Sequence, residues 1–521
     1  MSLLDEFETL RADAYKALVS DRGSLGQFYT PVPVASLLAS MIERPVADSI
    51  SLIDPGAGVG MLSAAAVSRL YALGVKKISL TVCEVAREVT PTLRAGMDLI
   101  ERWCGENEIG FQATVVEGDF IQWAVEQISD DLFAPEKIRF DLAILNPPYK
   151  KIQTDSVHRR QLQRLGLECT NLYAAFVYLS ARLLRAQGQL VSINPRSFAN
   201  GPYFRDFRQQ LFSIAPLSAV HVFGRRDRAF SSDNVLQENV VLRAVRGVAS
   251  QKLRIFTSEA GETVSTSMRE IPIERAISPG DPDQVLHLEA TDDDAEVTDL
   301  LRALPSTLVD IGIQVSTGRV VDFRAKDALR ISAGADTVPL IYPQHLRNAS
   351  VEWPKGAKKP DYFQPGSIYA SQLVPAGTYV LTKRFSSKEE KRRISASLIT
   401  TSVVPAAHYA LENHVNYFHA HGSPLDDALG IGLTAYLNST LADRYFRLYN
   451  GHTQVNATDL RAMPFPPASA LRELGKKLKG VQLVTENVDQ SVTQLCSQFA
   501  KKKAQGGSSN SGGPRSSSRA A

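Results

Sequence analysis

Between residues 49 and 245, short apolar stretches alternate with longer stretches whose apolar residues have helical spacing. This alternation constrains the fold more than any other feature of the chain. It is typical of an α/β protein with a doubly wound, mostly parallel sheet that helices cover on both faces. The predicted strands are 49–54, 78–84, 111–118, 140–145, 188–194, 217–223 and 239–245, and the predicted helices are 60–71, 87–103, 121–128, 171–186 and 203–214. Ligands of such sheets bind at the carboxyl ends of the strands, so residues directly after each strand are candidate site residues.

The chain has 521 residues, which is too long for one hydrophobic core and predicts two or three domains. The alternation stops near residue 248, and proline and glycine punctuate much of the later sequence. We interpret the ranges in this way: 1–248 the α/β domain, 249–304 a connector or peripheral strands, 305–467 a separate α+β domain with a helix near 433–449, 468–503 a C-terminal helix, and 504–521 a disordered tail.

The formal net charge is only +3, and residues 501–521 carry five basic residues and no acidic one. The overall charge therefore does not indicate a nucleic-acid-binding protein, and any basic surface must be local. The sequence has no leader-like N-terminus and no apolar run of about 18 residues, and its four cysteines form no CxxC pair. We expect a cytoplasmic protein with reduced thiols, without a membrane segment or a metal site.

The first predicted strand ends in a glycine-rich turn that contains Asp54, Gly56, Gly58 and Gly60. Glycines permit a tight turn and a close approach of the backbone to a ligand. The spacing is not the GxGxxG of dinucleotide sites, and no Lys-Ser/Thr pair follows as in phosphate-binding loops. The turn is therefore expected to approach a ligand without a pyrophosphate, and simple packing of the turn is the alternative.

Acidic residues follow the next two predicted strands. Glu84 can accept both hydrogen bonds of a ribose diol, or it can be a solvated residue at a helix start. Asp119 can accept from an adenine amino group while Phe120 covers the ring, and the alternative for Asp119 is a helix N-cap.

The fourth of these strands, 140–145, ends in Asn146-Pro147-Pro148-Tyr149. Prolines cannot donate to a sheet, so this segment must lie at or beyond the strand end. The Asn146 side-chain oxygen and the Pro147 carbonyl can both accept from one exocyclic NH2 group, which localises its nitrogen lone pair. Tyr149 can stack on the ring, and the prolines fix this geometry before a substrate arrives. A strand terminator followed by a loop is the alternative.

In these motifs and their order, the chain resembles the gamma-class, S-adenosyl-L-methionine-dependent N6-adenine DNA methyltransferases of type II restriction–modification systems, nearest the PstI/BsuBI-type modification methylases. The resemblance implies a class I methyltransferase fold, with a C-terminal target-recognition domain. It also implies methyl transfer to a flipped-out adenine in double-stranded DNA, functional pairing with a separate restriction endonuclease, and a monomer.

The resemblance assigns roles to individual residues. The cofactor residues are Phe28, Tyr29, Thr30 and Pro31 at the methionine end, Asp54, Gly56, Gly58 and Gly60 in the glycine turn, Glu84 at the ribose, and Asp119 and Phe120 at the adenine. The catalytic residues are Asn146, Pro147, Pro148 and Tyr149. Tyr149 and Phe230 are the residues expected to stack on the target base.

A basic segment of the C-terminal region, 383–393, has six basic and two acidic residues. We expect its Lys383, Arg384, Lys391, Arg392 and Arg393 to contact DNA phosphates, and a solvated charged loop is the alternative. Gln454 and Asn456 can read base edges or cap a turn.

Four other functions share parts of this pattern. We call the segment Asn146–Tyr149 the clamp. A cytosine-N4 methyltransferase of similar fold usually carries Ser at the first position of the clamp, where this chain has Asn146. A fused nuclease would use Asp361 with 389–391, and a protein-glutamine methyltransferase would use the same clamp on an amide. A catalytically inactive DNA-binding module is disfavoured because each strand-end residue needed for chemistry is present. The recognition sequence does not follow from these residues.

Overall fold

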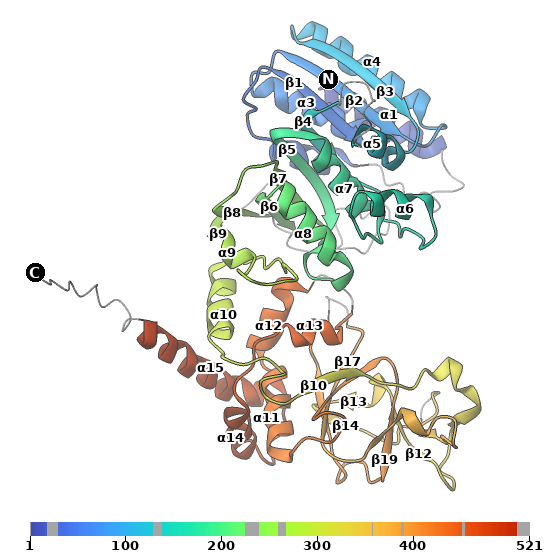
Figure 1. The fold of residues 1–521 in the computed structure, drawn as a ribbon, viewed down its shortest axis with the longest axis vertical. Coiled ribbons are helices and arrows are strands. Elements are labelled where there is room, and N and C mark those ends of the chain that lie inside the picture. The colour runs from blue at the N-terminus through green and yellow to red at the C-terminus, as the bar shows by residue number, and fades with distance from the viewer. Residues whose placement is uncertain are drawn as a thin grey trace, which may run out of the picture. The chain divides into compact units, whose positions relative to one another are not determined.

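The computed structural model describes residues 2–17, 30–128, 138–223, 239–258, 267–356, 358–386, 390–450 and 454–507. The chain divides into two compact units, Met1–Ala290 and Thr291–Ala521 (Figure 1). Each unit is described by itself.

Within its described residues, the N-terminal unit contains a nine-stranded sheet in the order β3-β2-β1-β4-β5-β7-β6-β8-β9. The strands are β1 (Ser49–Pro55), β2 (Lys77–Glu84), β3 (Gly110–Glu117), β4 (Phe140–Leu145), β5 (Leu184–Pro195), β6 (Leu217–Phe223), β7 (Asn239–Val245), β8 (Lys252–Ser258) and β9 (Ser267–Pro272). Strands β3, β2, β1, β4 and β5 pair in parallel, whereas β7 and β9 are antiparallel to their neighbours. The mostly parallel sheet expected from the sequence is confirmed.

Helices cover both faces of this sheet because successive strand residues point to opposite sides. Leu52 and Ile53 of β1 show the alternation, since they belong to two separate hydrophobic cores. One core joins the sheet to α1 (Leu3–Ala17), α2 (Val32–Ser40), α3 (Met61–Ala72) and α4 (Thr90–Glu106). The other joins it to α5 (Phe120–Ile128), α6 (Val157–Arg164), α7 (Leu172–Leu183) and α8 (Arg205–Ile214). The predicted helices agree with these within a few residues, apart from 171–186, whose last residues begin β5.

The range 249–304, predicted as a connector or peripheral strands, begins with peripheral strands in the structure and divides between the two units. Strands β8 and β9 extend the sheet, and the buried Leu253 and Ile255 of β8 pack into its core. The short helix α9 (Ile273–Ala276) follows, and α10 (Asp292–Arg302) belongs to the C-terminal unit. Polar residues on the outer face of these edge strands explain why the sequence of this range suggests a linker.

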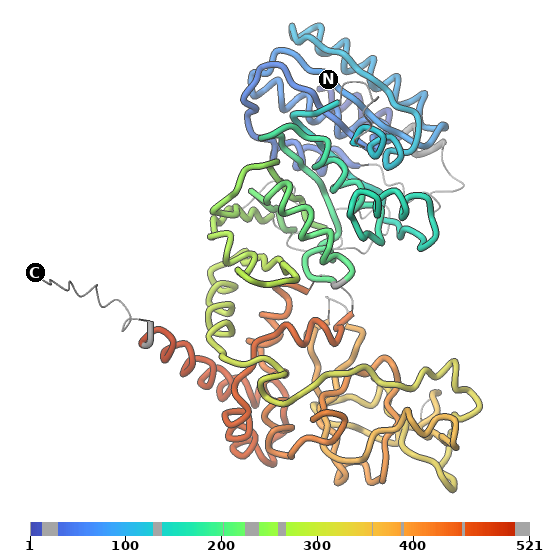
Figure 2. The backbone as a smooth tube through the Cα atoms, viewed as in Figure 1, coloured from blue at the N-terminus to red at the C-terminus, as the bar shows by residue number. Residues whose placement is uncertain are grey.

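The described part of the C-terminal unit holds two sheets and a group of helices, and the path of its backbone can be followed by colour in Figure 2. A six-stranded sheet has the order β10-β20-β17-β18-β14-β13, and a five-stranded sheet has the order β11-β15-β12-β19-β16. The strands are β10 (Gln314–Thr317), β11 (Leu329–Arg330), β12 (Val338–Ile341), β13 (Leu346–Arg347), β14 (Ser350–Val351), β15 (Tyr362–Phe363), β16 (Leu373–Pro375), β17 (Tyr379–Lys383), β18 (Ala396–Ile399), β19 (His408–Leu411) and β20 (Val415–His419). The helices after the sheets are α11 (Asp427–Leu437), α12 (Thr440–Tyr449), α13 (Ala457–Arg461), α14 (Ala468–Lys477) and α15 (Thr485–Gly507).

Two helix predictions in this unit are wrong. The helix predicted over 433–449 is broken at Asn438 and Ser439, because Ser439 caps α12 through the N–H of Ala442 and Asn438 bonds to the backbone of β18. The single helix predicted over 468–503 is two helices, α14 and α15. Tertiary hydrogen bonds of Asn438 decide the first break, whereas the second contains Gly480, whose φ of +82° lies in the left-handed region.

Candidate active site

The glycine turn after β1 has a backbone that only glycine adopts easily. Gly56, Gly58 and Gly60 have φ values of +71°, +57° and +90°, in the left-handed region. The Gly56 N–H donates to the carbonyl of Cys83 on β2 at 2.8 Å, which holds the turn against the next strand. A Cβ at Gly60 would lie 2.9 Å from Cε of Met97. The turn therefore needs these glycines both for conformation and for the close approach of α4.

Glu84 lies at the end of β2 and is 5% exposed. Its carboxylate accepts from the N–H of Gly58 at 2.8 Å, and from those of Val85 at 3.0 Å and Ala86 at 2.9 Å. The structure thus joins the glycine turn to the acidic residue of the second strand. Its contact with a ribose stays a prediction.

Asp54 at the end of β1 is fully buried. One carboxyl oxygen, Oδ2, accepts from Oγ of Ser63 at 2.7 Å, whereas Oδ1 is buried without a hydrogen-bond partner among the described residues. Burial raises the pKa of this carboxyl to about 7. A buried oxygen without a partner needs a ligand or water to satisfy it, so the turn and Asp54 fit a polar cofactor group.

Asp119 lies between β3 and α5 and makes two contacts. Its Oδ1 accepts from the N–H of Gln122 at 2.9 Å, which is the helix-cap role that the sequence left open. Its Oδ2 lies 2.9 Å from Nε2 of His158 on α6. Burial by itself would raise the pKa of Asp119, but the hydrogen bonds from His158 and Gln122 lower it below its ordinary value. Sequence spacing gave no signal for His158 as its partner.

We expect the Asp119–His158 pair to give a measurable pH signature. The hydrogen bond to Asp119 raises the pKa of His158. Protonated His158 therefore stabilises the folded state fully below pH 6.5, and this contribution disappears as pH rises through the raised pKa. The Asp119 contribution disappears only as pH falls through its lowered pKa. Because both side chains are about one-third exposed, the effect on unfolding should be below about 1 kcal/mol.

The measurement is an NMR titration of the His158 ring protons in the wild type and in Asp119→Asn. The substitution should move the His158 pKa down toward its ordinary value. An identical titration in both proteins would mean that the pair does not form in solution.

Phe120 is a correction to the predicted cofactor residues. Its ring is 3% exposed and packs against Phe176, with ring centroids 4.8 Å apart, and against Trp123 at 6.2 Å. An aromatic so fully covered by core residues has little surface for an adenine ring. The helical spacing of α5 directs this side chain into the core, which the strand-end pattern does not reveal.

The segment after β4 brings together residues far apart in the sequence. Nδ2 of Asn146 donates to Oγ1 of Thr30 at 3.1 Å, so the start of α2 lies against the clamp. Oη of Tyr149 donates to Oδ1 of Asn146 at 3.2 Å. Pro147 is buried, and Pro148 is partly buried. The amide of Asn146 is thus held on both sides, and its Oδ1 is oriented as an acceptor.

The Tyr149 ring is fixed by a second aromatic residue. It lies edge-on to Tyr173 of α7, with centroids 6.2 Å apart and an interplanar angle of 86°. The Tyr173 hydroxyl is 3.3 Å from that of Ser197. Burial raises the pKa of Tyr149 above its ordinary value, so the phenol is a neutral donor. The sequence gives no signal for the contact of Tyr173 with Tyr149, which is visible only in three dimensions.

The remaining predicted cofactor and base-stacking residues are Pro31, Phe28, Tyr29 and Phe230. Pro31 immediately precedes α2. Phe28, Tyr29 and Phe230 lie outside the described residues.

Two predicted phosphate-binding arginines are instead structural, which is a correction. Arg392 donates to the carbonyls of Leu437 at 3.2 Å and Ser439 at 2.9 Å, and to Oγ1 of Thr485 at 2.8 Å. It therefore satisfies the carbonyl end of α11 and ties it to α15. Arg393 is 1% exposed, and its Nη2 donates to Oδ1 of Asn450 at 2.8 Å.

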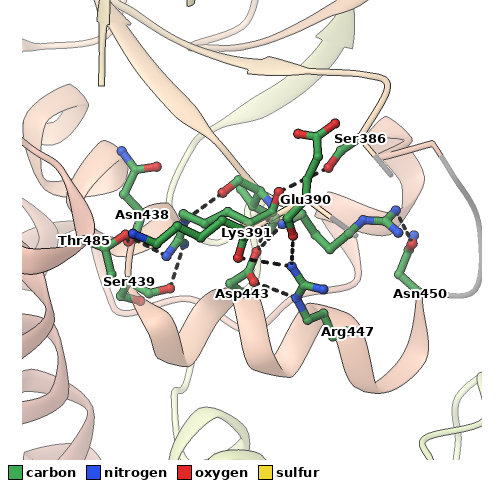
Figure 3. A network of polar contacts seen from close by, with 12 residues as sticks. Ser386, Glu390, Lys391, Asn438, Ser439, Asp443, Arg447, Asn450 and Thr485 are labelled. Atoms are coloured by element: carbon green, nitrogen blue, oxygen red, sulfur yellow. Dashed lines mark hydrogen bonds and ion pairs between the residues drawn. The ribbon is translucent and has the colours of Figure 1, made fainter. Parts of the chain in front are cut away.

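Figure 3 shows the network around these arginines. Asp443 of α12 accepts from the N–H groups of Arg393 and Ile394 at 2.7 and 2.9 Å and from Nε of Arg447 at 2.8 Å. Arg447 in turn donates to the carbonyl of Glu390 at 2.9 Å. The chain from 390 to 394 is therefore fastened to α12 and does not present all its cations to solvent.

The remaining residues of the predicted DNA surface differ in exposure. Lys391 has an 87% exposed side chain 3.3 Å from Glu486, and Lys383 and Arg384 are partly exposed at the end of β17. Asn456 begins α13 and forms a capping box with Asp459, so the turn-capping alternative is realised for it. Gln454 is partly exposed and pairs through its backbone with Phe385.

Comparison with known proteins identifies the class. The model of the Eco57I restriction-modification methylases matches residues 96–230, which contain Asp119 and the clamp. The structure of the type IIL restriction-modification enzyme MmeI in complex with DNA shares the fold at a TM-score of 0.54 and 12% identity, covering 98% of this chain and 74% of that chain. The fold that the chain shares with that enzyme is an α/β fold built on a large, mostly parallel sheet.

Sequence relatives define the family more narrowly. The chain is 40% identical over 475 residues to the type II methyltransferase M.PstI of Providencia stuartii, which covers 91% of this chain and 93% of the relative. It is also 40% identical over 464 residues to the type II methyltransferase M.BsuBI of Bacillus subtilis, covering 88% of this chain and 91% of the relative. The chain belongs to this family of type II methyltransferases, as its motifs predict.

No helix in the described part of the chain combines the length and the apolar character needed to cross a membrane.

Proposed function

We propose that this methyltransferase transfers a methyl group from S-adenosyl-L-methionine to N6 of an adenine flipped out of double-stranded DNA. The observation that carries the proposal is the clamp, in which Thr30 and Tyr149 orient the Asn146 amide beside Pro147 at the carboxyl end of β4. An enzyme acting on a base must take it out of the helix, and its pocket then reads the exposed edge.

The clamp acts on the amine of the substrate. Oδ1 of Asn146 and the Pro147 carbonyl accept its two N–H groups, which withdraws the nitrogen lone pair from the aromatic ring and makes it a better nucleophile. The neutral Tyr149 ring covers one face of the base. Because these groups are positioned by protein contacts before the base arrives, little reorganisation is needed during the reaction.

The cofactor is held by the ends of the preceding strands. The glycine turn and Asp54 accommodate its polar methionine end, Glu84 binds the ribose diol, and Asp119 accepts from its adenine amino group. Support comes from the unpartnered Oδ1 of Asp54 and from the adjacency of Glu84 and Gly58. When bound, the cofactor supplies an electrophilic methyl group.

We further propose that methylation protects host DNA from a separate restriction endonuclease, that the enzyme is a cytoplasmic monomer, and that the C-terminal unit recognises the target. The description of the matching family model as a restriction-modification methylase supports the pairing. A fused nuclease is disfavoured because its proposed acidic residue, Asp361, is buried. Oδ1 of Asp361 lies 2.8 Å from Nε2 of His345, and Oδ2 accepts from the N–H of Gly356 at 2.7 Å, so the carboxylate is used within the fold.

The test is to express the chain in cells that lack DNA methylation and to map modified bases by single-molecule sequencing. We expect N6-methyladenine at one short sequence motif throughout the genome, and none in cells expressing Asn146→Ala. N4-methylcytosine at the motif would instead establish the cytosine-N4 alternative. Unmodified DNA from cells with abundant folded enzyme would contradict DNA methylation altogether.

A further inference from the structure

The C-terminal unit has an exposed turn formed by 319–330, with two short 3-10 helices, η3 (Asp322–Arg324) and η4 (Lys326–Ala328). It lies at the end of this unit away from α14 and α15 (Figure 1). Phe323 at its tip is 63% exposed, and the Arg324 guanidinium lies over its ring at 5.5 Å. A large aromatic side chain held in solvent beneath a cation is a candidate contact residue.

Basic side chains surround this aromatic. We call Arg319, Phe323, Arg324, Lys326, Lys358 and Lys359 the tip surface, and all six are exposed. An ion pair joins the two segments that carry them, because Nζ of Lys359 is 3.1 Å from the carboxylate of Asp322 in the turn 319–330. The cations therefore belong to one folded surface although they lie up to forty positions apart in the sequence.

The two acidic residues of the turn cancel only part of the charge of the five cations. Asp322 is paired with Lys359, and the Asp327 carboxylate accepts from Oη of Tyr369 at 2.9 Å. Arg324, Lys326 and Lys358 have no acidic partner within salt-bridge distance among the described residues. The surface has an excess of positive charge around a single exposed ring.

This combination matches the chemistry of duplex DNA. Lysine and arginine neutralise phosphates, and an exposed phenylalanine can wedge against a base step or sugar in the minor groove. We propose that the tip surface binds duplex DNA, with Phe323 against the bases and Arg324, Lys326 and Lys358 at phosphates. The inference rests on the proposed function, and it moves the main contact away from 390–393, where Arg392 and Arg393 serve the fold.

The test measures the affinity of the full chain for a labelled duplex of mixed sequence, at several salt concentrations. The triple variant Arg324→Glu/Lys326→Glu/Lys358→Glu should bind at least about tenfold more weakly than the wild type. The salt slope is the slope of the logarithm of the binding constant against the logarithm of the salt concentration. In this variant its magnitude should fall by about one for each phosphate that is no longer neutralised. Phe323→Ala should weaken binding by about tenfold while keeping the wild-type slope, because it removes an uncharged contact.

A matched charge control is Lys476→Glu/Lys477→Glu/Lys479→Glu, which reverses three exposed cations at and just after the end of α14. It should retain more affinity than the tip triple variant. Thermal unfolding and cofactor affinity, which should match the wild type in all variants, establish folding.

Two outcomes overturn the proposal: tip variants that bind like the α14 control, or a wild type that does not bind duplex DNA. Failure of the methylation mapping is distinguishable from both, because DNA affinity is measured without methyl transfer. If adenine methylation persists but the tip variants bind normally, only the tip assignment fails.

Discussion

Replacing Asn146 by alanine should reduce methyl transfer at least about a thousandfold while leaving cofactor affinity within a few-fold of the wild type. The substitution removes the oriented Oδ1, which is one of the two proposed acceptors for the amine. It also removes the hydrogen bonds to Thr30 and Tyr149, but the cofactor residues after β1 and β2 are held by separate contacts. Single-turnover methylation of the mapped duplex and equilibrium binding of labelled cofactor measure the two effects.

Two companion variants sharpen this result. Tyr149→Phe keeps the ring but loses the hydroxyl that orients Asn146, so we expect a smaller loss of about tenfold. Asn107→Ala removes an amide whose one hydrogen bond within the described part of the chain is to the carbonyl of Trp103 at the end of α4, and activity should be unchanged. If Asn146→Ala abolished cofactor binding as well, Asn146 would be a structural residue of the cofactor site.

Replacing Arg393 by methionine should lower the free energy of unfolding of the C-terminal unit by about 3 kcal/mol or more. The guanidinium is buried, bonds to Asn450 and lies 6.0 Å from the Phe446 ring. Its charge also lowers the pKa of the buried Asp459, although burial as the larger cause raises that pKa to about 6. Removing the cation leaves the buried Oδ1 of Asn450 without this hydrogen bond and the buried Asp459 without this nearby positive charge. Chemical denaturation of the purified chain measures the change.

Lys391→Met is the matched control, since it removes a neighbouring cation whose side chain is 87% exposed. Its effect on unfolding should stay within about 0.5 kcal/mol. DNA binding separates the two possible roles of Arg393. In native conditions the Arg393→Met protein should keep the salt slope of the wild type. A slope reduced by about one would instead show that Arg393 contacts a DNA phosphate, as the sequence predicts.

Much of the N-terminal unit was predictable because its signals are local. A parallel sheet buried on both faces requires continuous apolar strands, and its crossover helices require apolar residues at helical spacing. The strand 140–145 was predicted with the bounds that β4 has in the structure, since prolines end it abruptly. The order of strand-end residues likewise placed Asp54, Glu84, Asp119 and Asn146 at the carboxyl edge.

Less of the C-terminal unit was predictable because its strands are short and many of its pairings join distant residues. Strands of two to five residues carry too few side chains for a clear alternation. The basic segment illustrates the consequence. A run of lysines and arginines has the same composition whether its cations face solvent or bind carbonyl groups. The buried position of Arg393 depends on Asn450, which is distant in sequence.

Local patterns in the amino-acid sequence are enough to establish the α/β sheet, the glycine turn and the Asn-Pro-Pro-Tyr clamp, because backbone preference and apolar spacing act over a few residues. Tertiary structure alone decides that Phe120 enters the core, that His158 pairs with Asp119 and that Thr30 supports Asn146. Those outcomes depend on which side chains meet after the chain has folded, and pairs separated by up to 116 positions leave no periodic trace in the sequence.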